Sequence, residues 1–325
     1  MKISDIRALR EEETGKTCHF FALLKSLQSR KAKNGSDFLM LEFGDNTGTL
    51  AGMCFDSSPA FNQLKNASAG DVFETEAEID FYQGRLSPKI FHARKLDSEE
   101  AAACAESLVE RSPLNPEEMR SELQAAIDRI SDSVLKSVVE TALEEAGAEF
   151  FTSVAAVRMH HAYLNGLLEH TLKCARTTIA LLPLYPFVDA DLALAGTILH
   201  DIGKVLEYSQ GLAVEKTRVG ILQGHVVLGY RMVRRAAIKC GLDPLLRERL
   251  EHIILSHQGE LEWGAAAKAA TPEAVFVSSI DNLDAKLGAV ESAIRNAEGA
   301  EFVDVPALRL KVLATPPIHP QHTDI

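Results

Sequence analysis

A short apolar stretch that ends in two ionisable residues places the strongest constraint on how this chain can fold. Residues 192–199 read Leu-Ala-Leu-Ala-Gly-Thr-Ile-Leu, and His200 and Asp201 follow directly. A helix that is apolar on nearly all sides has to be buried on most of them. An imidazole and a carboxylate at the end of such a helix are costly unless they pair or bind a metal. The sequence therefore predicts a helical domain with a polar centre in its interior.

Further histidine and aspartate residues recur through the same region at intervals of about one helix and its connector. Each of them could come from a different helix and point into one bundle interior, where all-α proteins build metal sites. Imidazole and carboxylate ligands together suit divalent transition metals. A single histidine on an apolar helix is more often structural, so the prediction of a metal site rests on the whole set: His170, His200, Asp201, His225, His257 and Asp281.

Lys204 lies three residues after Asp201, on the same helical face if the helix continues. A metal beside a lysine suits phosphate chemistry, because the metal acts as a Lewis acid and the ammonium group can carry phosphoryl charge. We therefore predict that Asp201 and Lys204 are catalytic.

Two pairs of histidines require a choice. His252 and His257 are five residues apart, so on a regular helix they point about 140° away from each other. We assign His257 to the metal site and His252 to a structural role. His160 and His161 are adjacent, so at most one faces inward. We expect His161 to contact the substrate or to support a ligand.

The N-terminal part has the pattern of short strands. Residues 17–24, 38–43, 49–55, 72–82 and 86–93 are rich in β-formers, and turn signals such as Gly44-Asp45-Asn46-Thr47-Gly48 and Gln83-Gly84 separate them. Five strands with a break at residues 57–66 favour a five-stranded Greek-key barrel of OB type, with another small barrel or sandwich as the alternative.

The remaining chain is predicted to be helical. Apolar residues recur at helical spacing in residues 167–182, 191–199, 224–239, 245–256 and 272–290. Asn115 and Pro116 form a helix start, as N-cap and first helical residue. We therefore expect an OB-like domain at 1–97, an acidic helical connector at 98–150, an all-α helical bundle at 151–313 and a flexible tail at 314–325. The alternative for residues 98–150 is that they form the first helices of the next domain.

The net charge of −12 does not by itself exclude a nucleic-acid partner, because the acidity is concentrated in one segment. Residues 98–150 hold 13 acidic and 4 basic residues, whereas residues 1–97 hold 14 and 13. The barrel can therefore carry a basic face. The first residues lack an apolar signal segment, no apolar run approaches a membrane span, and the five scattered cysteines suit reduced thiols. We expect a cytoplasmic protein without membrane contact.

The motifs around these residues resemble one known family. The strings are HHAYLNGLLEHT at 160–171, LHDIGK at 199–204, GH at 224–225, ILSHQG at 254–259 and DNLDAK at 281–286. Together they resemble the YhaM-type 3′–5′ exoribonucleases, which join an OB domain to an HD metal phosphohydrolase domain. The resemblance covers about residues 15–300. It places the six predicted ligands on the motif's ligand positions and Lys204 on the basic position after the HD pair.

The resemblance implies one or two divalent ions per chain, with Mn²⁺ expected first and Fe²⁺, Co²⁺, Ni²⁺ or Mg²⁺ as alternatives. The chain departs from the family at Gln258, where two adjacent histidines are common, and more mildly at Asn165-Gly166. A glutamine is a poor metal ligand, so we do not expect Gln258 to replace that second histidine.

OB folds bind single strands through positive charge and aromatic faces. Most of the barrel phenylalanines are expected in the core. The residues that we expect to bind nucleic acid are Lys25, Arg30, Lys31, Lys33, Tyr82, Arg85 and Lys89.

We therefore expect a 3′–5′ exonuclease that hydrolyses single-stranded RNA, and also single-stranded DNA, to 5′-mononucleotides. One alternative is an HD phosphohydrolase of small nucleotides or cyclic dinucleotides. The other is a single-strand-binding protein with a catalytically weak HD domain. Assembly into a homo-oligomer stays open.

Overall fold

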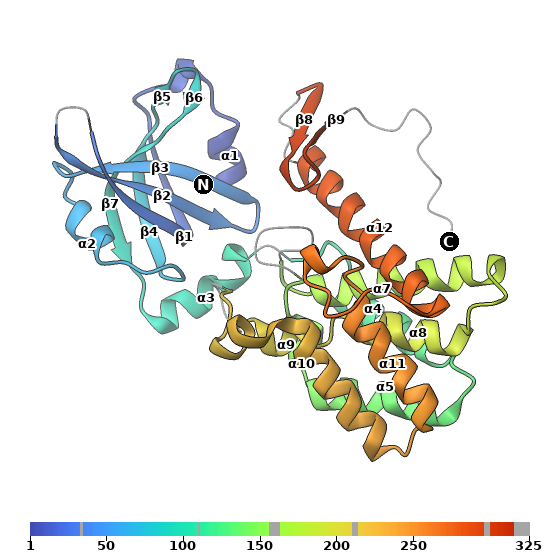
Figure 1. Cartoon of the computed structure of the whole chain (residues 1–325). Coiled ribbons are helices and arrows are strands. Elements are labelled where there is room, and N and C mark those ends of the chain that lie inside the picture. Colours follow the sequence, from blue (N-terminus) through green and yellow to red (C-terminus); the bar gives the residue numbers. More distant parts are fainter. Residues whose placement is uncertain (33–34, 110, 156–162, 210–213, 296–299, 315–325) are drawn as a thin grey trace. The chain divides into compact units, whose positions relative to one another are not determined.

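The chain forms two compact units in the computed structural model, which describes residues 1–32, 35–109, 111–155, 163–209, 214–295 and 300–314 (Figure 1). One unit comprises Met1–Arg111 together with Ser209–Glu215, and the other comprises Ser112–Tyr208 and Lys216–Ile325. The first is built on strands and the second on helices.

The first unit is a closed five-stranded barrel, as the sequence predicted. Its strands lie in the order β1-β2-β3-β7-β4. A parallel contact between Met53 and Lys89 closes the barrel, while the other neighbouring strands run antiparallel. The strands are β1 (Thr17–Lys31), β2 (Asp37–Asp45), β3 (Gly48–Phe55), β4 (Val72–Glu78) and β7 (Lys89–Lys95).

The barrel core is formed by side chains that alternate between buried and exposed along the strands. Along the start of β1, Cys18, Phe20 and Ala22 are buried, while Thr17, His19 and Phe21 alternate with them and are exposed. Phe43 packs edge-on against Phe20 and Phe73, with ring centroids 5.9 and 6.4 Å apart. Helix α1 (Ile3–Arg7) adds two fully buried isoleucines to this core, and α2 (Phe61–Lys65) fills the expected break between β3 and β4. Phe20, Phe43 and Phe73 thus form part of the expected core, whereas Phe21 and Phe91 are exposed.

One predicted strand is divided. The expected strand at 72–82 ends at Glu78, and β5 (Phe81–Tyr82) pairs instead with β6 (Arg85–Leu86) as a separate hairpin. The turn residues Gln83 and Gly84 have positive φ angles of 52° and 75°. Two consecutive residues with positive φ form the tight turn that two-residue hairpins favour.

The second unit is a helical bundle around one core, followed by a short hairpin. Nearly every residue of α8 is buried, from Leu192 to Leu199, as its apolar sequence requires. The predicted cap is also present, since the Asn115 side chain accepts hydrogen bonds from the backbone of Glu117 and Glu118. The longer helices of this unit are α4 (Pro116–Ile127), α5 (Ser133–Ala146), α7 (Gly166–Leu181), α8 (Ala190–Leu199), α10 (Arg218–Lys239), α11 (Pro244–Ser256) and α12 (Pro272–Arg295), with short helices α6 (Glu149–Thr152) and α9 (Lys204–Glu207).

Residues 98–150 are divided between the two compact units, so that only their second part follows the alternative of first helices of the next domain. Helix α3 (Ser98–Leu108) belongs to the first unit, whereas α4 and α5 belong to the second, because their apolar faces share a core with α7 and α8. The expectation of helix up to residue 313 is wrong at its end. Residues Phe302–Val305 (β8) and Leu310–Leu313 (β9) pair as a hairpin, in which the β-branched Val303 and Val312 face each other.

None of the helices in the described ranges combines the length and the apolar character that crossing a membrane requires.

Candidate metal centre

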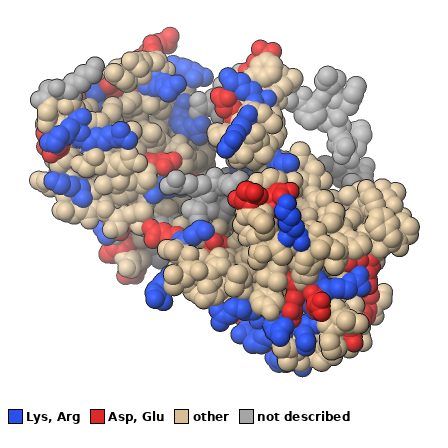
Figure 2. Space-filling view, in the orientation of Figure 1, with Lys and Arg blue, Asp and Glu red and all other residues tan. Residues whose placement is uncertain are grey.

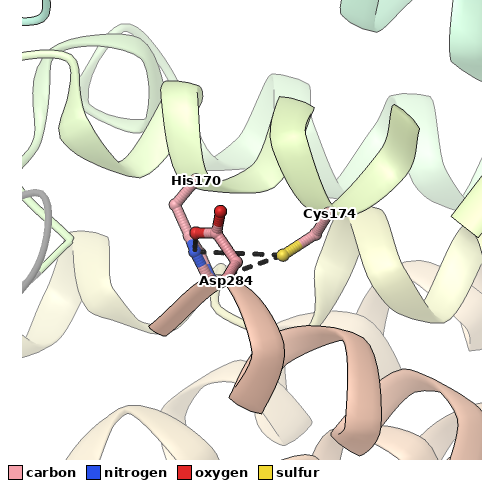
Figure 3. A group of neighbouring side chains, drawn as sticks. All are labelled: His170, Cys174 and Asp284. Atoms are coloured by element: carbon pink, nitrogen blue, oxygen red, sulfur yellow. Dashed lines mark hydrogen bonds and ion pairs between the residues drawn. The ribbon is translucent and has the colours of Figure 1, made fainter. Parts of the chain in front are cut away.

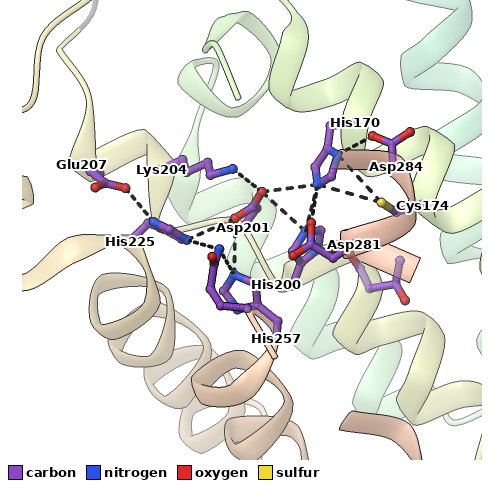
Figure 4. A network of polar contacts seen from close by, with 12 residues as sticks. His170, Cys174, His200, Asp201, Lys204, Glu207, His225, His257, Asp281 and Asp284 are labelled. Carbon is purple, nitrogen blue, oxygen red and sulfur yellow. Dashed lines mark hydrogen bonds and ion pairs between the residues drawn. The ribbon is translucent and has the colours of Figure 1, made fainter. Parts of the chain in front are cut away.

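The six predicted ligands lie together in the interior of the helical unit (Figure 4). His170 comes from α7, His225 from α10 and Asp281 from α12, while the His200–Asp201 pair directly follows α8 and His257 directly follows α11. His170, His200 and His257 are completely buried and Asp201 is nearly so, while His225 and Asp281 lie at the rim with side chains about one-sixth exposed.

Asp201 stands between two pairs of histidines. Its Oδ2 atom lies 3.4 Å from Nε2 of both His170 and His200. Its Oδ1 atom lies 3.5 Å from Nε2 of His225 and 3.6 Å from Nε2 of His257. Each pair forms with Asp201 a group whose ligand atoms lie within 4.8 Å of one another, close enough to hold a metal ion.

Asp281 extends the first of these groups. Its Oδ1 atom lies 3.3 Å from Nε2 of His170 and 3.7 Å from Nε2 of His200. The two Nε2 atoms of this group are themselves 3.0 Å apart. We name the set His170, His200, Asp201 and Asp281 position A, and the set Asp201, His225 and His257 position B.

Every histidine of the centre is held by its other ring nitrogen. Nδ1 of His200 donates to the Thr197 carbonyl, and Nδ1 of His257 donates to the Ile254 carbonyl, each at 2.7 Å. This arrangement turns Nε2 of each ring toward the centre, which is how metal-ligating histidines are usually oriented.

Two carboxylates hold the remaining two rings in the same way. Nδ1 of His170 lies 2.7 Å from Asp284 Oδ2, and Nδ1 of His225 lies 2.7 Å from Glu207 Oε2. Sequence reasoning did not identify either acid. Asp284 could have been found, because it lies one helical turn after Asp281, whereas Glu207 has no comparable signal.

The donor set fits a divalent cation. Asp201 Oδ1 is buried and accepts no hydrogen bond from any residue that the structure describes. A buried carboxylate oxygen without a partner is destabilising, because it has lost its hydration. A cation between Asp201 and the histidines would satisfy it, so the residues present fit a divalent metal ion.

The charges of the centre are strongly coupled. Burial acts to raise the pKa of Asp201, but the charges of Lys204 and His200 outweigh it and hold that pKa well below its usual range. Burial likewise acts to lower the pKa of His200, but the nearby Asp201 carboxylate raises it to about 10. At His257 burial prevails, and the pKa is lowered.

Lys204 reaches the centre through a tight turn, although the expected helix does not continue. Helix α8 ends at Leu199, and the Lys204 backbone N–H donates to the Asp201 carbonyl at 3.0 Å. The turn brings Lys204 Nζ to 2.5 Å from Asp201 Oδ2, in an almost fully buried position. The two side chains therefore lie together as expected, but a turn and not a continued helix brings them together.

Two glycines explain how α9 and α10 approach each other. A Cβ atom on Gly203 would lie 2.0 Å from the His225 carbonyl oxygen and 2.4 Å from the Gly229 nitrogen. Gly224 has a φ of 68° and breaks the regular course of α10 directly before His225. Only glycine tolerates both features at low cost, so these residues set where the His225 backbone lies.

Cys174 lies next to His170, one turn further along α7 (Figure 3). Its sulfur is 3.9 Å from Nδ1 and 3.8 Å from Nε2 of His170, and together with Asp284 it forms a further group of metal-ligand types. Because Asp284 already forms a hydrogen bond with His170 Nδ1, we infer that Asp284 and Cys174 hold the His170 ring in place and do not form a separate metal site.

Other predicted residues lie elsewhere or outside the described residues. Nε2 of His252 accepts a hydrogen bond from the Ala270 backbone at 2.9 Å, away from the centre. His161 and Lys33 lie outside the described residues.

The described barrel residues with a predicted nucleic-acid role are on its surface. Lys25, Arg30 and Lys31 are on β1, and Tyr82 and Arg85 flank the β5–β6 turn, with the Tyr82 side chain 64% exposed. Lys31 and Lys89 form ion pairs with Asp37 and Asp80 at 3.3 and 2.9 Å. Figure 2 shows lysine and arginine side chains spread over the visible barrel face among acidic ones.

Comparison with known proteins extends this picture to the whole chain. The HD domain family matches residues 167–286, the span that holds all six predicted ligands. A protein named 3′–5′ exoribonuclease YhaM from Listeria monocytogenes is 30% identical over 296 residues, which cover 91% of this chain and 94% of that protein. One of the same name from a Geobacillus species is 30% identical over 292 residues, covering 90% of this chain and 89% of that protein.

Among solved structures, the second OB-fold domain of replication protein A from Methanococcus maripaludis matches with a TM-score of 0.22 and 14% identity, covering 26% of this chain and 88% of that chain. That likeness is too low to carry an argument. The similarity to the curated relatives spans both units, and on that ground the chain belongs to the YhaM 3′–5′ exoribonuclease family.

Proposed function

We propose that this protein hydrolyses single-stranded RNA from the 3′ end and releases 5′-mononucleotides, using divalent cations at positions A and B. The observation that carries the proposal is the placement of Asp201, whose two carboxylate oxygens each face a different pair of histidine Nε2 atoms. The names of the curated relatives support RNA as substrate and the 3′ end as starting point.

The metal would supply Lewis-acid chemistry, polarising the phosphoryl group and lowering the pKa of a water molecule. His170, His200 and Asp281 would hold one ion together with Asp201 Oδ2. His225 and His257 would hold a second ion together with Asp201 Oδ1. Mn²⁺ is the ion that we expect first, because these imidazole and carboxylate donors suit it.

Lys204 is proposed to stabilise the negative charge that develops on the phosphoryl group. Its ammonium group is buried and is held by Asp201, so it would lie beside a bound ion without serving as a ligand. A fixed cation in a site with little water stabilises such charge more strongly than it would in bulk solvent.

The barrel is proposed to hold the RNA strand without reading its sequence. Exposed basic side chains on β1 and at the β5–β6 turn can contact phosphates, and Tyr82 can stack on a base. The same contacts suit single-stranded DNA, so we propose that DNA is also cleaved.

A time course on an unstructured RNA labelled at either end tests the proposal. With Mn²⁺ present, 5′-labelled RNA should shorten stepwise, whereas 3′-labelled RNA should release labelled mononucleotide at once. Chelator should stop both reactions, and Asp201→Asn should abolish them while the exposed-site control Asp304→Asn does not. Internal cleavage, or hydrolysis confined to mononucleotides or cyclic dinucleotides, would contradict the proposal.

A further inference from the structure

We propose that positions A and B bind metal unequally, and that Gln258 makes position B the weaker and more readily exchanged one. This inference rests on the proposed function, because it assumes that both positions take divalent cations. It concerns the order and strength of metal binding, which the proposed activity leaves open.

The Gln258 side chain lies between the two histidines of position B. Its amide nitrogen is 3.2 Å from Nε2 of His225 and 3.2 Å from Nε2 of His257. Because Nδ1 of each ring already donates to Glu207 or Ile254, each Nε2 carries a lone pair. The two N–H groups of a primary amide can therefore donate one hydrogen bond to each ring.

A cation at position B has to compete with these hydrogen bonds. The lone pairs that accept from the amide are the same lone pairs that would bind the metal. Before both rings can coordinate, the amide has to turn away or rotate so that its oxygen faces the ion. Either change removes two hydrogen bonds and so weakens the apparent affinity of position B.

At position A, a carboxylate takes the place that the Gln258 amide has at position B. There the carboxylate of Asp281 faces the two imidazoles, with Oδ1 3.3 Å from His170 Nε2 and 3.7 Å from His200 Nε2. Position A therefore offers two carboxylates, Asp201 and Asp281, whereas position B offers one shared carboxylate and a neutral amide. The ammonium group of Lys204 lies on the shared Asp201 carboxylate and so opposes a cation at either position. The additional carboxylate of Asp281 therefore favours a cation at position A.

The amide also affects which ion position B accepts. If its oxygen becomes a ligand, the position combines imidazole, carboxylate and carbonyl donors. Carbonyl and carboxylate oxygens suit hard ions such as Mn²⁺ and Mg²⁺. We therefore expect position A to stay occupied at low metal concentration and position B to fill and empty as the free Mn²⁺ concentration changes.

Calorimetric Mn²⁺ titration of the chelator-stripped full chain, with electron paramagnetic resonance of the free ion, tests this inference. The protein should bind one ion tightly and a second at least about tenfold more weakly, the range in which groups around a metal site alter affinity. Gln258→Glu has nearly the same shape and adds a carboxylate, so it should tighten the weaker class about tenfold or more. The same change at exposed Gln124, on α4, is the control and should leave both classes unchanged.

A second variant assigns the classes. His225→Asn should remove the weak class and retain the tight one, since His225 belongs to position B alone. Two equal classes in the unaltered protein would overturn the inference. So would a weak class that Gln258→Glu leaves unchanged, or loss of the tight class in His225→Asn with an unaltered circular dichroism spectrum.

The outcome is separable from that of the proposed function because the readout is metal binding. Two unequal classes without RNA cleavage would support the inference and contradict the proposed function. RNA cleavage with two equal classes would contradict the inference alone, and a folded protein that binds no divalent ion would overturn both.

Discussion

Asp284 Oδ2 lies 2.7 Å from Nδ1 of His170, while Nε2 of the same ring lies 3.4 Å from Asp201 Oδ2. The carboxylate thus fixes the orientation and the tautomer of a ring whose other nitrogen faces the centre. Acids in this position raise the basicity of the ligand and are commonly worth 10–100-fold in metal affinity.

We therefore predict that Asp284→Ala lowers the affinity for the tightly bound ion by about 10–100-fold without unfolding the protein. Asp284→Asn should lose less, because its amide oxygen can still accept from Nδ1. Metal titration with circular dichroism provides the measurement, and Asp304→Ala serves as an exposed control. Unchanged affinity in Asp284→Ala would mean that the contact plays no part in metal binding.

Lys204 provides a prediction about turnover. Because its ammonium group pairs with Asp201 but is not a metal ligand, Lys204→Ala should lower kcat by about 10²–10³-fold, the usual effect of removing one group that stabilises charge in the transition state. Metal affinity should not fall, since the variant removes a competing cation. Lys204→Arg should recover part of the rate, and near-normal turnover of Lys204→Ala with metal bound would refute the assigned role.

The sequence predicted the barrel and the principal helices because their patterns reflect burial. The alternation around Phe20 predicts which face of the strand is buried, and the apolar run before His200 predicts a helix that is buried on most sides. The six candidate ligands could be named because imidazoles and carboxylates in apolar surroundings are costly without partners.

Other features depend on contacts that local pattern does not encode. Nothing in the sequence distinguishes Glu207, which lies behind His225, from a solvated acid. Likewise, the turn that brings Lys204 to Asp201 depends on α10 packing against Gly203, and α4 joins the helical unit through its core contacts. Long-range packing therefore decides the domain boundary and the residues that support the ligands.

Metal binding should depend on pH because His200 has to lose a proton to become a ligand. Although burial acts to lower its pKa, Asp201 raises that pKa to about 10, so the metal-stripped protein keeps the ring protonated at neutral pH. A raised pKa favours the protonated, non-binding form at every pH below it. Burial likewise acts to lower the pKa of His170, but contacts with Cys174, Asp281 and Asp284 outweigh it and raise that pKa well above its usual range. Affinity at position A should therefore increase as pH rises from 6 to 9, with protons released from both rings.

Calorimetry in buffers of different ionisation enthalpy measures that proton release directly. His225→Asn is a suitable comparison, because it leaves His200 and position A in place. Affinity independent of pH across this range would show that His200 is already neutral before the metal binds.

The barrel surface allows a test of strand binding that is independent of the metal centre. Tyr82→Ala removes an exposed ring at the β5–β6 turn and should weaken binding of a long RNA about tenfold, within the usual range for loss of one stacked base. Metal binding should be unaffected, because Tyr82 belongs to the barrel unit and not to the metal centre. Tyr185→Ala, in the helical unit, is the exposed aromatic control.

Arg85 is expected to act through charge. A plot of the logarithm of the RNA-binding constant against the logarithm of salt concentration should be less steep for Arg85→Ala. The change in slope should correspond to the loss of about one phosphate contact. If Tyr82→Ala and Arg85→Ala bind long RNA as tightly as the unaltered protein does, the strand-binding surface lies elsewhere.

The close approach of α9 and α10 gives the last prediction, which concerns the framework of the centre. A methyl group on Gly203 would meet the His225 carbonyl at 2.0 Å, and a backbone carbonyl cannot move aside as a side chain can. Gly203→Ala should therefore lower the free energy of unfolding by about 1–3 kcal/mol, as overpacking of a core does. Gly196→Ala is the matched comparison, because there the added methyl group meets the side chain of Ile253, 2.8 Å away, and a helical alanine offsets part of the cost.

Gly203→Ala should also affect metal binding, because it displaces the His225 backbone. The variant should lose the weakly bound Mn²⁺ ion before the tightly bound one. Urea unfolding with metal titration of both variants measures the two effects, and equal stability of Gly203→Ala and the unaltered protein would show that α10 can move without cost.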